Sequence, residues 1–338
     1  MQQPTAPTHT YFPYLDGWRG IAILIVLLHH FAGFGPGDIG VQVFFVLSGK
    51  LMSQVLFVDR TPLTTFYRRR VARVFPVFYL YLATIALASV VFEPSRSNSD
   101  LFYTAIFLRT YLPGPTIWSP SIPIGHLWSL NVEEHSYVVL SLVAFAAASS
   151  GPRTSKITLP LLALGCLVAY ALYSAHPPIP TASPAMLRTE CAAFGLMLSA
   201  GLHLYRRRDN TKFFWPALVV TLLLLMADMF GNVAINPIRL VLLPAALAVL
   251  VNVIDGAPKV ILDLLSAPWL RWFGVVSFSL YVWQQPFLWL SMRGYVSQSQ
   301  GCLLAILAGA ASYYWFEAPM RSWIRNRRAR TYGTARGS

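Results

Sequence analysis

A histidine and an arginine lie in the first apolar segment of the chain, residues 15–31. Arg19 and His30 are eleven positions apart, so on a helix they fall within about 20° of the same face and about 16 Å apart along its axis. Ionisable side chains inside apolar segments are usually functional or paired. A buried neutral imidazole could deprotonate a hydroxyl as that hydroxyl attacks a thioester. Alternatively, the imidazole has a purely structural role and joins two helices through a hydrogen bond. His29 points about 100° away, which favours a helix-contact role for it.

A second group of polar residues stands at the start of a later apolar segment, residues 127–148. It contains His126, Trp128, Glu133 and Glu134. Carboxylates in this position could orient a histidine, accept hydrogen bonds from sugar hydroxyls or neutralise a buried cation. We therefore take the two glutamates as candidate catalytic residues, and His126 and Trp128 as candidate substrate-binding residues.

Lys50 lies near the middle of the second apolar segment, residues 39–58. At that depth its ammonium group cannot easily extend to water. It must be paired, for example with Glu133 or Glu134, or be neutral, or face a wet cavity.

Three arginines, Arg69, Arg70 and Arg73, stand where the third apolar segment begins. Arg70 and Arg73 are three positions apart and share a helix face, where their guanidinium groups could bind phosphates through paired hydrogen bonds. Arginines at a cytoplasmic helix end also set the topology of any membrane protein. Both interpretations remain open on these residues alone.

The composition places these polar residues on membrane helices. Of 338 residues, 56% are hydrophobic and 12% are charged, whereas soluble domains carry about 25% charge. A membrane-spanning helix needs about 20 predominantly apolar residues. Ten segments meet this need, so the sequence predicts an all-α bundle of about ten transmembrane helices: residues 15–31, 39–58, 71–92, 127–148, 157–175, 185–205, 213–230, 237–254, 273–292 and 302–320.

The distribution of charge predicts the orientation of this bundle. With ten crossings and the N-terminus in the cytoplasm, most of the 26 lysines and arginines fall in cytoplasmic connections, and the C-terminus is cytoplasmic too. We expect residues 1–320 to form the transmembrane domain and 321–338 a basic cytoplasmic tail. Residues 101–112 are too short to span and are expected at the interface or as a re-entrant segment.

The same distribution excludes other classes of function. A formal charge of +13 might suggest nucleic acid, but the basic residues form short runs between apolar stretches, so we expect no nucleic-acid partner. The three cysteines each fall inside an apolar segment and none has metal-ligand spacing. We therefore expect neither a metal site nor a disulfide.

Six motifs, in order along nearly the whole chain, resemble those of the acyltransferase-3 membrane proteins. The first is Tyr14-Leu15-Asp16-Gly17-Trp18-Arg19-Gly20-Ile21-Ala22 followed by His30, and the second covers residues 40–49. The others are Arg69-Arg70-Val71-Ala72-Arg73 followed by Pro76, Trp128-Ser129-Leu130 with Glu133-Glu134, Ser279-Leu280-Tyr281-Val282-Trp283, and Phe316-Glu317-Ala318-Pro319.

This resemblance implies an enzyme of the plasma (inner) membrane. Such a protein takes an acyl group, usually acetyl, from acyl-CoA as co-substrate on the cytoplasmic side. It passes the group to a hydroxyl of a saccharide or a lipid-linked glycan, or in some members of a secondary metabolite. Carried over to this chain, the resemblance makes His30 the base and Arg19 its motif partner, and it places Arg69, Arg70 and Arg73 at the phosphates of coenzyme A. Besides the acceptor, membrane lipids are the partners it implies.

Three positions depart from the family pattern: Gln42 replaces a common acid, Lys50 an apolar residue, and Gln284 a histidine after the tryptophan. These departures leave the donor side intact, and we assign all three residues to acceptor binding. Two other functions remain open. One is a transporter or flippase with an intramembrane proton relay, and the other is a non-catalytic scaffold with the same fold.

Overall fold

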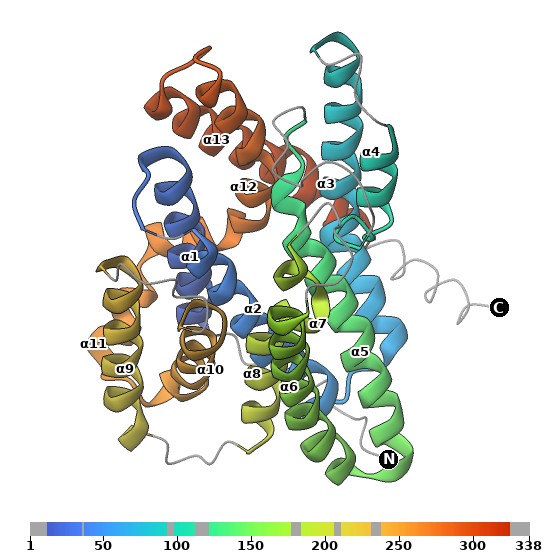
Figure 1. Cartoon of the computed structure of the whole chain (residues 1–338), viewed down its shortest axis with the longest axis vertical. Helices are drawn as coiled ribbons and strands as arrows, with labels where there is room; N and C mark the ends of the chain where they lie inside the picture. Colours follow the sequence, from blue (N-terminus) through green and yellow to red (C-terminus); the bar gives the residue numbers. More distant parts are fainter. Residues whose placement is uncertain are drawn as a thin grey trace, which may run out of the picture.

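The computed structural model describes residues 12–35, 37–92, 98–111, 122–176, 184–205, 211–230 and 238–324. Every regular element in these ranges is helical (Figure 1), so the all-α prediction is confirmed for this part of the chain. The α-helices are α1 (Pro13–Ala32), α2 (Asp38–Ser53), α3 (Leu63–Phe92), α4 (Asn98–Ala105), α5 (Trp128–Ser150), α6 (Pro152–Ala175), α7 (Thr189–Ala192), α8 (Phe194–Tyr205), α9 (Thr211–Phe230), α10 (Leu243–Val253), α11 (Lys259–Leu265), α12 (Pro268–Met292) and α13 (Gln298–Ser312). Short π or 3-10 helices flank some of them: η1 (Gln54–Val58), η2 (Gly125–Leu127), η3 (Ala185–Leu187), η4 (Ile238–Leu242), η5 (Ile254–Gly256) and η6 (Tyr313–Glu317).

Several of these helices are long and apolar enough to cross a membrane. Among the described residues there are six, or up to seven if one bent pair of helices counts as a single span. Large apolar side chains such as Leu87, Leu161 and Leu223 are more than half exposed on α3, α6 and α9, as suits helices that face lipid tails. The chain is thus a multi-pass membrane protein, while the total of ten spans and the orientation of the termini stay predictions.

Two segments differ from the expected continuous helices. Residues 185–205 are divided into η3, α7 and α8, because Arg188 adopts an extended backbone (ψ 151°) between η3 and α7. After α10 the chain bends by 111° into α11, a helix that the apolar pattern did not predict. The short segment 101–112 includes the end of α4, which has only 8 residues. The predicted tail, residues 321–338, lies outside the described residues from position 325 onward.

Helices α1 and α12 pack so closely that glycine is required between them. A Cβ atom at Gly274 would lie 1.8 Å from the carbonyl oxygen of Asp16, and one at Gly20 would lie 2.1 Å from that of Leu270. Small residues permit this backbone approach between membrane helices. The contact fixes Arg19 and His30 of α1 against α12.

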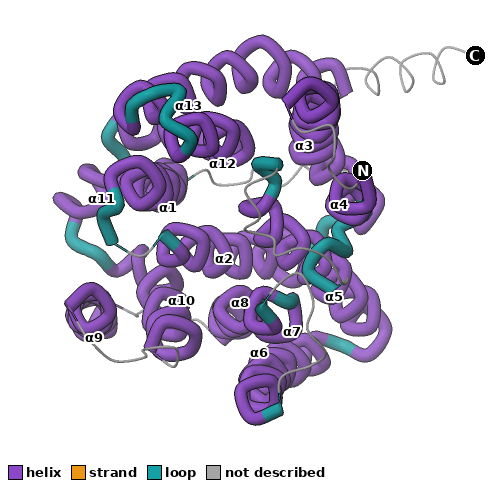
Figure 2. The backbone as a smooth tube through the Cα atoms, turned by 45° about the horizontal axis from the view of Figure 1, so that its top comes forward, coloured by secondary structure: helices purple, strands orange, loops and turns teal. Residues whose placement is uncertain are grey.

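Helix α2 lies in the middle of the bundle, between α1 on one side and α8 and α10 on the other (Figure 2). It also contacts α5. Its two faces therefore meet different sets of polar residues.

Candidate active site

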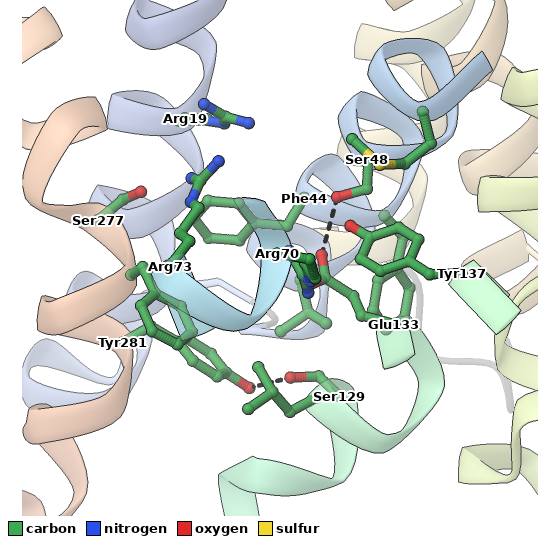
Figure 3. A pocket seen from close by; sticks show the side chains of 15 residues that line it. Arg19, Phe44, Ser48, Arg70, Arg73, Ser129, Glu133, Tyr137, Ser277 and Tyr281 are labelled. Carbon is green, nitrogen blue, oxygen red and sulfur yellow. Dashed lines mark hydrogen bonds and ion pairs between the residues drawn. The ribbon is translucent and has the colours of Figure 1, made fainter. Parts of the chain in front are cut away.

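A cavity of about 70 Å³ lies between α1, α2, α3, α5 and α12 (Figure 3). Water needs at least about 10–15 Å³ of such volume, so the cavity has room for several waters or a small organic group. Four predicted site residues, which come from helices far apart in sequence, line this cavity: Arg19, Arg70, Arg73 and Glu133. The polar lining comprises Arg19, Ser48, Arg70, Arg73, Ser129, Glu133, Tyr137, Ser277 and Tyr281.

Arg70 is held by two carboxylates inside the bundle. Its Nε donates to Glu134 Oε1 and its Nη2 to Glu133 Oε2, each at 2.8 Å. The ring of Tyr137 lies 4.2 Å from its Cζ, and Glu133 also accepts a hydrogen bond from Ser48 Oγ at 2.8 Å. The charge of this guanidinium is thus already balanced by two carboxylates, which makes Arg70 a poorer phosphate ligand than an arginine without such partners. The ion pair considered for Lys50 with these glutamates is wrong, because they bind Arg70 instead.

Arg19 and Arg73 face one another at the cavity (Figure 3). Arg19 Nη1 lies 3.6 Å from Asp16 Oδ1, a long ion pair. Arg73 makes no hydrogen bond or ion pair with any residue that the structure describes. Two neighbouring cations repel each other, and an anion between them would relieve that repulsion. Guanidinium groups suit phosphate anions in particular.

A second, wider pocket of about 540 Å³ begins at Arg73. We call it the basic pocket; it is lined by Arg68, Arg69, Ala72, Arg73, Tyr313, Ala318, Arg321, Ser322 and Ile324. Since Arg73 lines both hollows, the cavity and the basic pocket meet at this side chain. Of the predicted phosphate-binding residues, Arg69 and Arg73 lie here and Arg70 does not.

His30 lies farther along α1 and is not among the residues that line the cavity. Its Nδ1 is 2.9 Å from Gln284 Oε1 on α12. With that oxygen as acceptor, Nδ1 carries the proton and the Nε2 lone pair is free to accept one. Gln284 is fully buried and follows Tyr281, a cavity residue, by three positions, about 4.5 Å along the helix axis. Gln284 thus joins His30 to the part of α12 that lines the cavity.

His29 faces a different environment from its neighbour. Its Nδ1 bonds to the carbonyl oxygen of Gly35 at the end of α1. This contact is local to the α1–α2 connection, as expected for a helix-contact residue.

His126 and Trp128 are buried in the wall beside the cavity. His126 Nε2 lies 3.1 Å from Val282 O, and the backbone oxygen of His126 accepts a hydrogen bond from Tyr281 at 2.7 Å. Trp128 packs edge-on against Phe45, a cavity residue, with ring centroids 5.9 Å apart. The His126 backbone and the Trp128 ring thus contact residues that line the cavity.

Lys50 and Gln42 lie on the other face of α2. Lys50 Nζ donates to Val251 O at 2.9 Å and is 3.6 Å from Asp255 Oδ2. Tyr14 also donates to Asp255. Gln42 is buried toward Gly195 of α8. The structure therefore brings neither predicted acceptor residue into the cavity.

The sequence prediction assigned no role to several cavity residues. Ser129 and Tyr137 stand four positions before and after Glu133, so the helical period around that glutamate could have identified them. Ser277 and Tyr281 have the same spacing on α12. Asp255, the partner of Lys50, had no comparable signal because it is 205 positions away.

Comparison with known proteins agrees with the resemblance seen in the sequence motifs. A family model described as "Acyltransferase domain" (Acyl_transf_3) matches residues 12–316. The Bacillus subtilis protein YrhL is 26% identical over 93% of this chain and 55% of its own length. The peptidoglycan O-acetyltransferase OatA of Listeria monocytogenes is 25% identical over 95% of this chain and 56% of its own length. The O-acetyltransferase OatA of Staphylococcus aureus is 27% identical over 47% of this chain and 29% of its own length.

This chain therefore spans little more than half the length of the first two relatives. No solved structure matches it. The family match covers the cavity, His30 and the arginines of α3 together, from the start of α1 into η6. The chain belongs to the acyltransferase-3 family.

Proposed function

We propose that this protein is an O-acyltransferase of the plasma membrane. It moves an acyl group, acetyl in the first instance, from acyl-CoA to a hydroxyl of a saccharide or lipid-linked glycan. The observation that carries the proposal is the facing pair Arg19 and Arg73, on a cavity lined also by Tyr281, three positions before Gln284, the partner of His30. Its relative from Listeria monocytogenes, named a peptidoglycan O-acetyltransferase, supports a saccharide as acceptor.

In this proposal the arginines bind the donor and His30 performs the proton transfer. Phosphates of acyl-CoA lie at Arg73 and Arg19, and the pantetheine arm runs through the cavity toward His30, about 16 Å along α1 from Arg19. The cavity of about 70 Å³ is too small for the arm as it stands. Lining side chains such as Phe44 and Met52 must therefore change rotamer when the donor enters.

The chemical step needs one base. His30 Nε2 accepts the proton of the acceptor hydroxyl while the hydroxyl oxygen attacks the thioester carbonyl. The carbon–sulfur bond then breaks, and the departing thiolate takes the proton from the imidazolium. Gln284 holds Nδ1 and thereby keeps Nε2 as the reactive nitrogen. The entering donor displaces water from the cavity, which limits hydrolysis of the thioester.

The test is transfer of radiolabelled acetyl from acetyl-CoA to peptidoglycan fragments by the protein in proteoliposomes. His30→Ala should lower kcat by about 100-fold or more, because general base catalysis contributes about 10²–10⁴-fold. His29→Ala is the matched control and should keep most of the activity, since its bond to Gly35 is local. Equal transfer by His30→Ala and the wild type would refute the assignment. Solute uptake without label transfer would instead favour the transporter.

A further inference from the structure

We propose that His126 binds the acceptor through its Nδ1, which accepts a hydrogen bond from a second hydroxyl of the sugar whose first hydroxyl reacts at His30. This inference rests on the proposed function and deepens it, because it names a further contact between the protein and its acceptor. It also requires an acceptor with at least two hydroxyl groups, which a saccharide has and a simple alcohol lacks.

The imidazole of His126 is held in one orientation by α12 and by two tyrosine rings. Its Nε2 lies 3.1 Å from Val282 O. In a regular helix that carbonyl would accept from the backbone nitrogen four positions later, but this position is Pro286, which has no N–H. The proline thus leaves Val282 O available to His126. The rings of Tyr81 and Tyr281 pack against the imidazole, with centroids 5.6 and 5.4 Å away.

The bond to Val282 determines which nitrogen of His126 carries the proton. A carbonyl oxygen can only accept, so Nε2 is the donor and Nδ1 keeps its lone pair. Nδ1 is buried and has no hydrogen-bond partner among the described residues, and the residue as a whole is 3% exposed. Because buried polar atoms are nearly always hydrogen-bonded, we expect this nitrogen to meet a group that the protein itself does not supply.

His126 and His30 are attached to neighbouring positions of α12. Val282, which accepts from His126, is two positions before Gln284, which accepts from His30 Nδ1 at 2.9 Å. The two attachment points are therefore about 3 Å apart along the helix axis, and the two imidazoles interact electrostatically. Each ring has one nitrogen fixed by α12 and a lone pair on the other, so together they can accept hydrogen bonds from two hydroxyls of one molecule.

Gln284 adds a hydrogen-bond donor to these two acceptors. Its Oε1 binds His30, while its Nε2 is buried without a hydrogen-bond partner in the part of the chain that the structure describes. A hydroxyl group both donates and accepts, so a sugar hydroxyl that donates to His126 can accept from Gln284. An amide N–H or an ether oxygen would satisfy only one of the two.

The acceptor, rather than acyl-CoA, is the molecule that we assign to His126. In the proposed function the arm of the donor fills the cavity lined by Arg19 and Arg73. Neither His126 nor His30 is among the residues that line this cavity. A group bound at His126 is therefore outside the path of the arm and belongs to the molecule whose hydroxyl meets His30.

The experiment replaces each nitrogen of the ring in turn by an amide. A glutamine side chain places its amide near the position of Nε2, and an asparagine side chain near that of Nδ1. His126→Gln can therefore keep the donor to Val282 O and lose the acceptor, whereas His126→Asn keeps the acceptor and loses the donor. Initial rates in proteoliposomes give KM for peptidoglycan fragments and for acetyl-CoA, and thermal unfolding in detergent gives the stability of each variant.

His126→Gln should raise KM for the fragments about tenfold, as expected for the loss of one hydrogen bond to a substrate. It should keep KM for acetyl-CoA and the melting temperature of the wild type. His126→Asn should have a lower melting temperature, because Val282 O loses its donor, and a nearly wild-type KM for the fragments. His203→Gln is the matched control: its Nε2 also binds an oxygen, Gln54 Oε1 at 2.9 Å, and it is not a cavity residue, so neither KM should change.

Three other results would overturn the inference. A wild-type KM for the fragments in His126→Gln with a raised KM in His126→Asn would show that His126 acts only through Val282. A raised KM for acetyl-CoA in His126→Gln would assign Nδ1 to an amide N–H of the pantetheine arm. Unchanged KM values in both variants would show that only water binds at Nδ1.

Binding of the fragments in detergent, measured by calorimetry without acetyl-CoA, separates this inference from the proposed function. Tenfold weaker binding to His126→Gln, in a protein that transfers no acetyl group, would contradict the function and retain the contact. Acetyl transfer with unchanged binding by His126→Gln would contradict the contact alone. A wild-type protein that neither binds the fragments nor acetylates them would contradict both.

Discussion

At the scale of single residues, two arginines one helical turn apart on α3 have different surroundings. Arg70 contacts Glu133, Glu134 and Tyr137, whereas Arg73 contacts no carboxylate among the described residues and faces Arg19. Removing one partner of a buried ion pair leaves an uncompensated charge in a low-dielectric environment. Removing Arg73, which makes no ion pair with a described residue, strands no paired carboxylate in this way.

We therefore expect Arg70→Ala to lower the stability of the protein and Arg73→Ala to weaken donor binding. Arg70→Ala should destabilise the protein by about 3–5 kcal/mol, because two carboxylates stay buried without their cation. Arg73→Ala should keep the wild-type melting temperature and raise KM for acetyl-CoA about tenfold or more, with KM for the acceptor unchanged. Thermal unfolding in detergent and initial rates would measure both effects. Similar melting temperatures for the two variants would contradict the role given to the glutamates.

At the scale of elements, the site depends on how closely α1 approaches α12. Gly274 and Gly20 allow the two backbones to touch, which positions His30 against Gln284. A side chain between the helices must push them apart, and packed interiors tolerate such insertions poorly.

Gly274→Ala should consequently destabilise the bundle by about 1–3 kcal/mol and lower kcat as His30 moves from Gln284. Gly165→Ala on α6 is the matched control, since nothing lies within 4 Å of a Cβ atom there. It should stabilise the protein slightly, by about 0.5–1 kcal/mol, because alanine favours the helix over glycine. Thermal unfolding of both variants, with activity measured on the same samples, would decide; an unaffected Gly274→Ala protein would show that this contact is not required.

At the scale of the whole molecule, the chain passes back and forth between the two ends of the bundle. The connection from α5 to α6 lies at the bottom of Figure 1 and that from α12 to α13 at the top. This arrangement permits donor and acceptor to approach from opposite sides of a membrane, as the proposed function requires.

The predicted orientation assigns the first of these connections to the cytoplasm and the second to the outside. In a variant whose three cysteines are replaced, Arg153→Cys should react with an impermeant maleimide only in inside-out vesicles. Tyr295→Cys should react in intact cells. Both positions are exposed, so a failure to label either would not come from burial. The reverse pattern would invert the bundle and place the basic pocket outside, away from coenzyme A.

The sequence alone determined the class of the protein and the types of residue at its site. Runs of about 20 apolar residues and a low fraction of charge require membrane helices, because a chain this apolar has too little polar surface to face water. The positions of Arg19, His30 and Arg73 within those helices, and the order of the six motifs, were sufficient to predict the family. These properties are local, because they depend on composition and on a fixed helical period.

Only the tertiary structure decided which polar residues meet. His30 bonds to Gln284, Lys50 approaches Asp255 and Arg70 lies between two glutamates, and each partner comes from a helix distant in sequence. The helical period tells which face a residue occupies but not which helix packs against that face. That choice depends on the packing of the whole bundle, including backbone contacts such as Gly274 with Asp16. It separates Arg73, which makes no ion pair with a described residue, from Arg70, which is neutralised by Glu133 and Glu134.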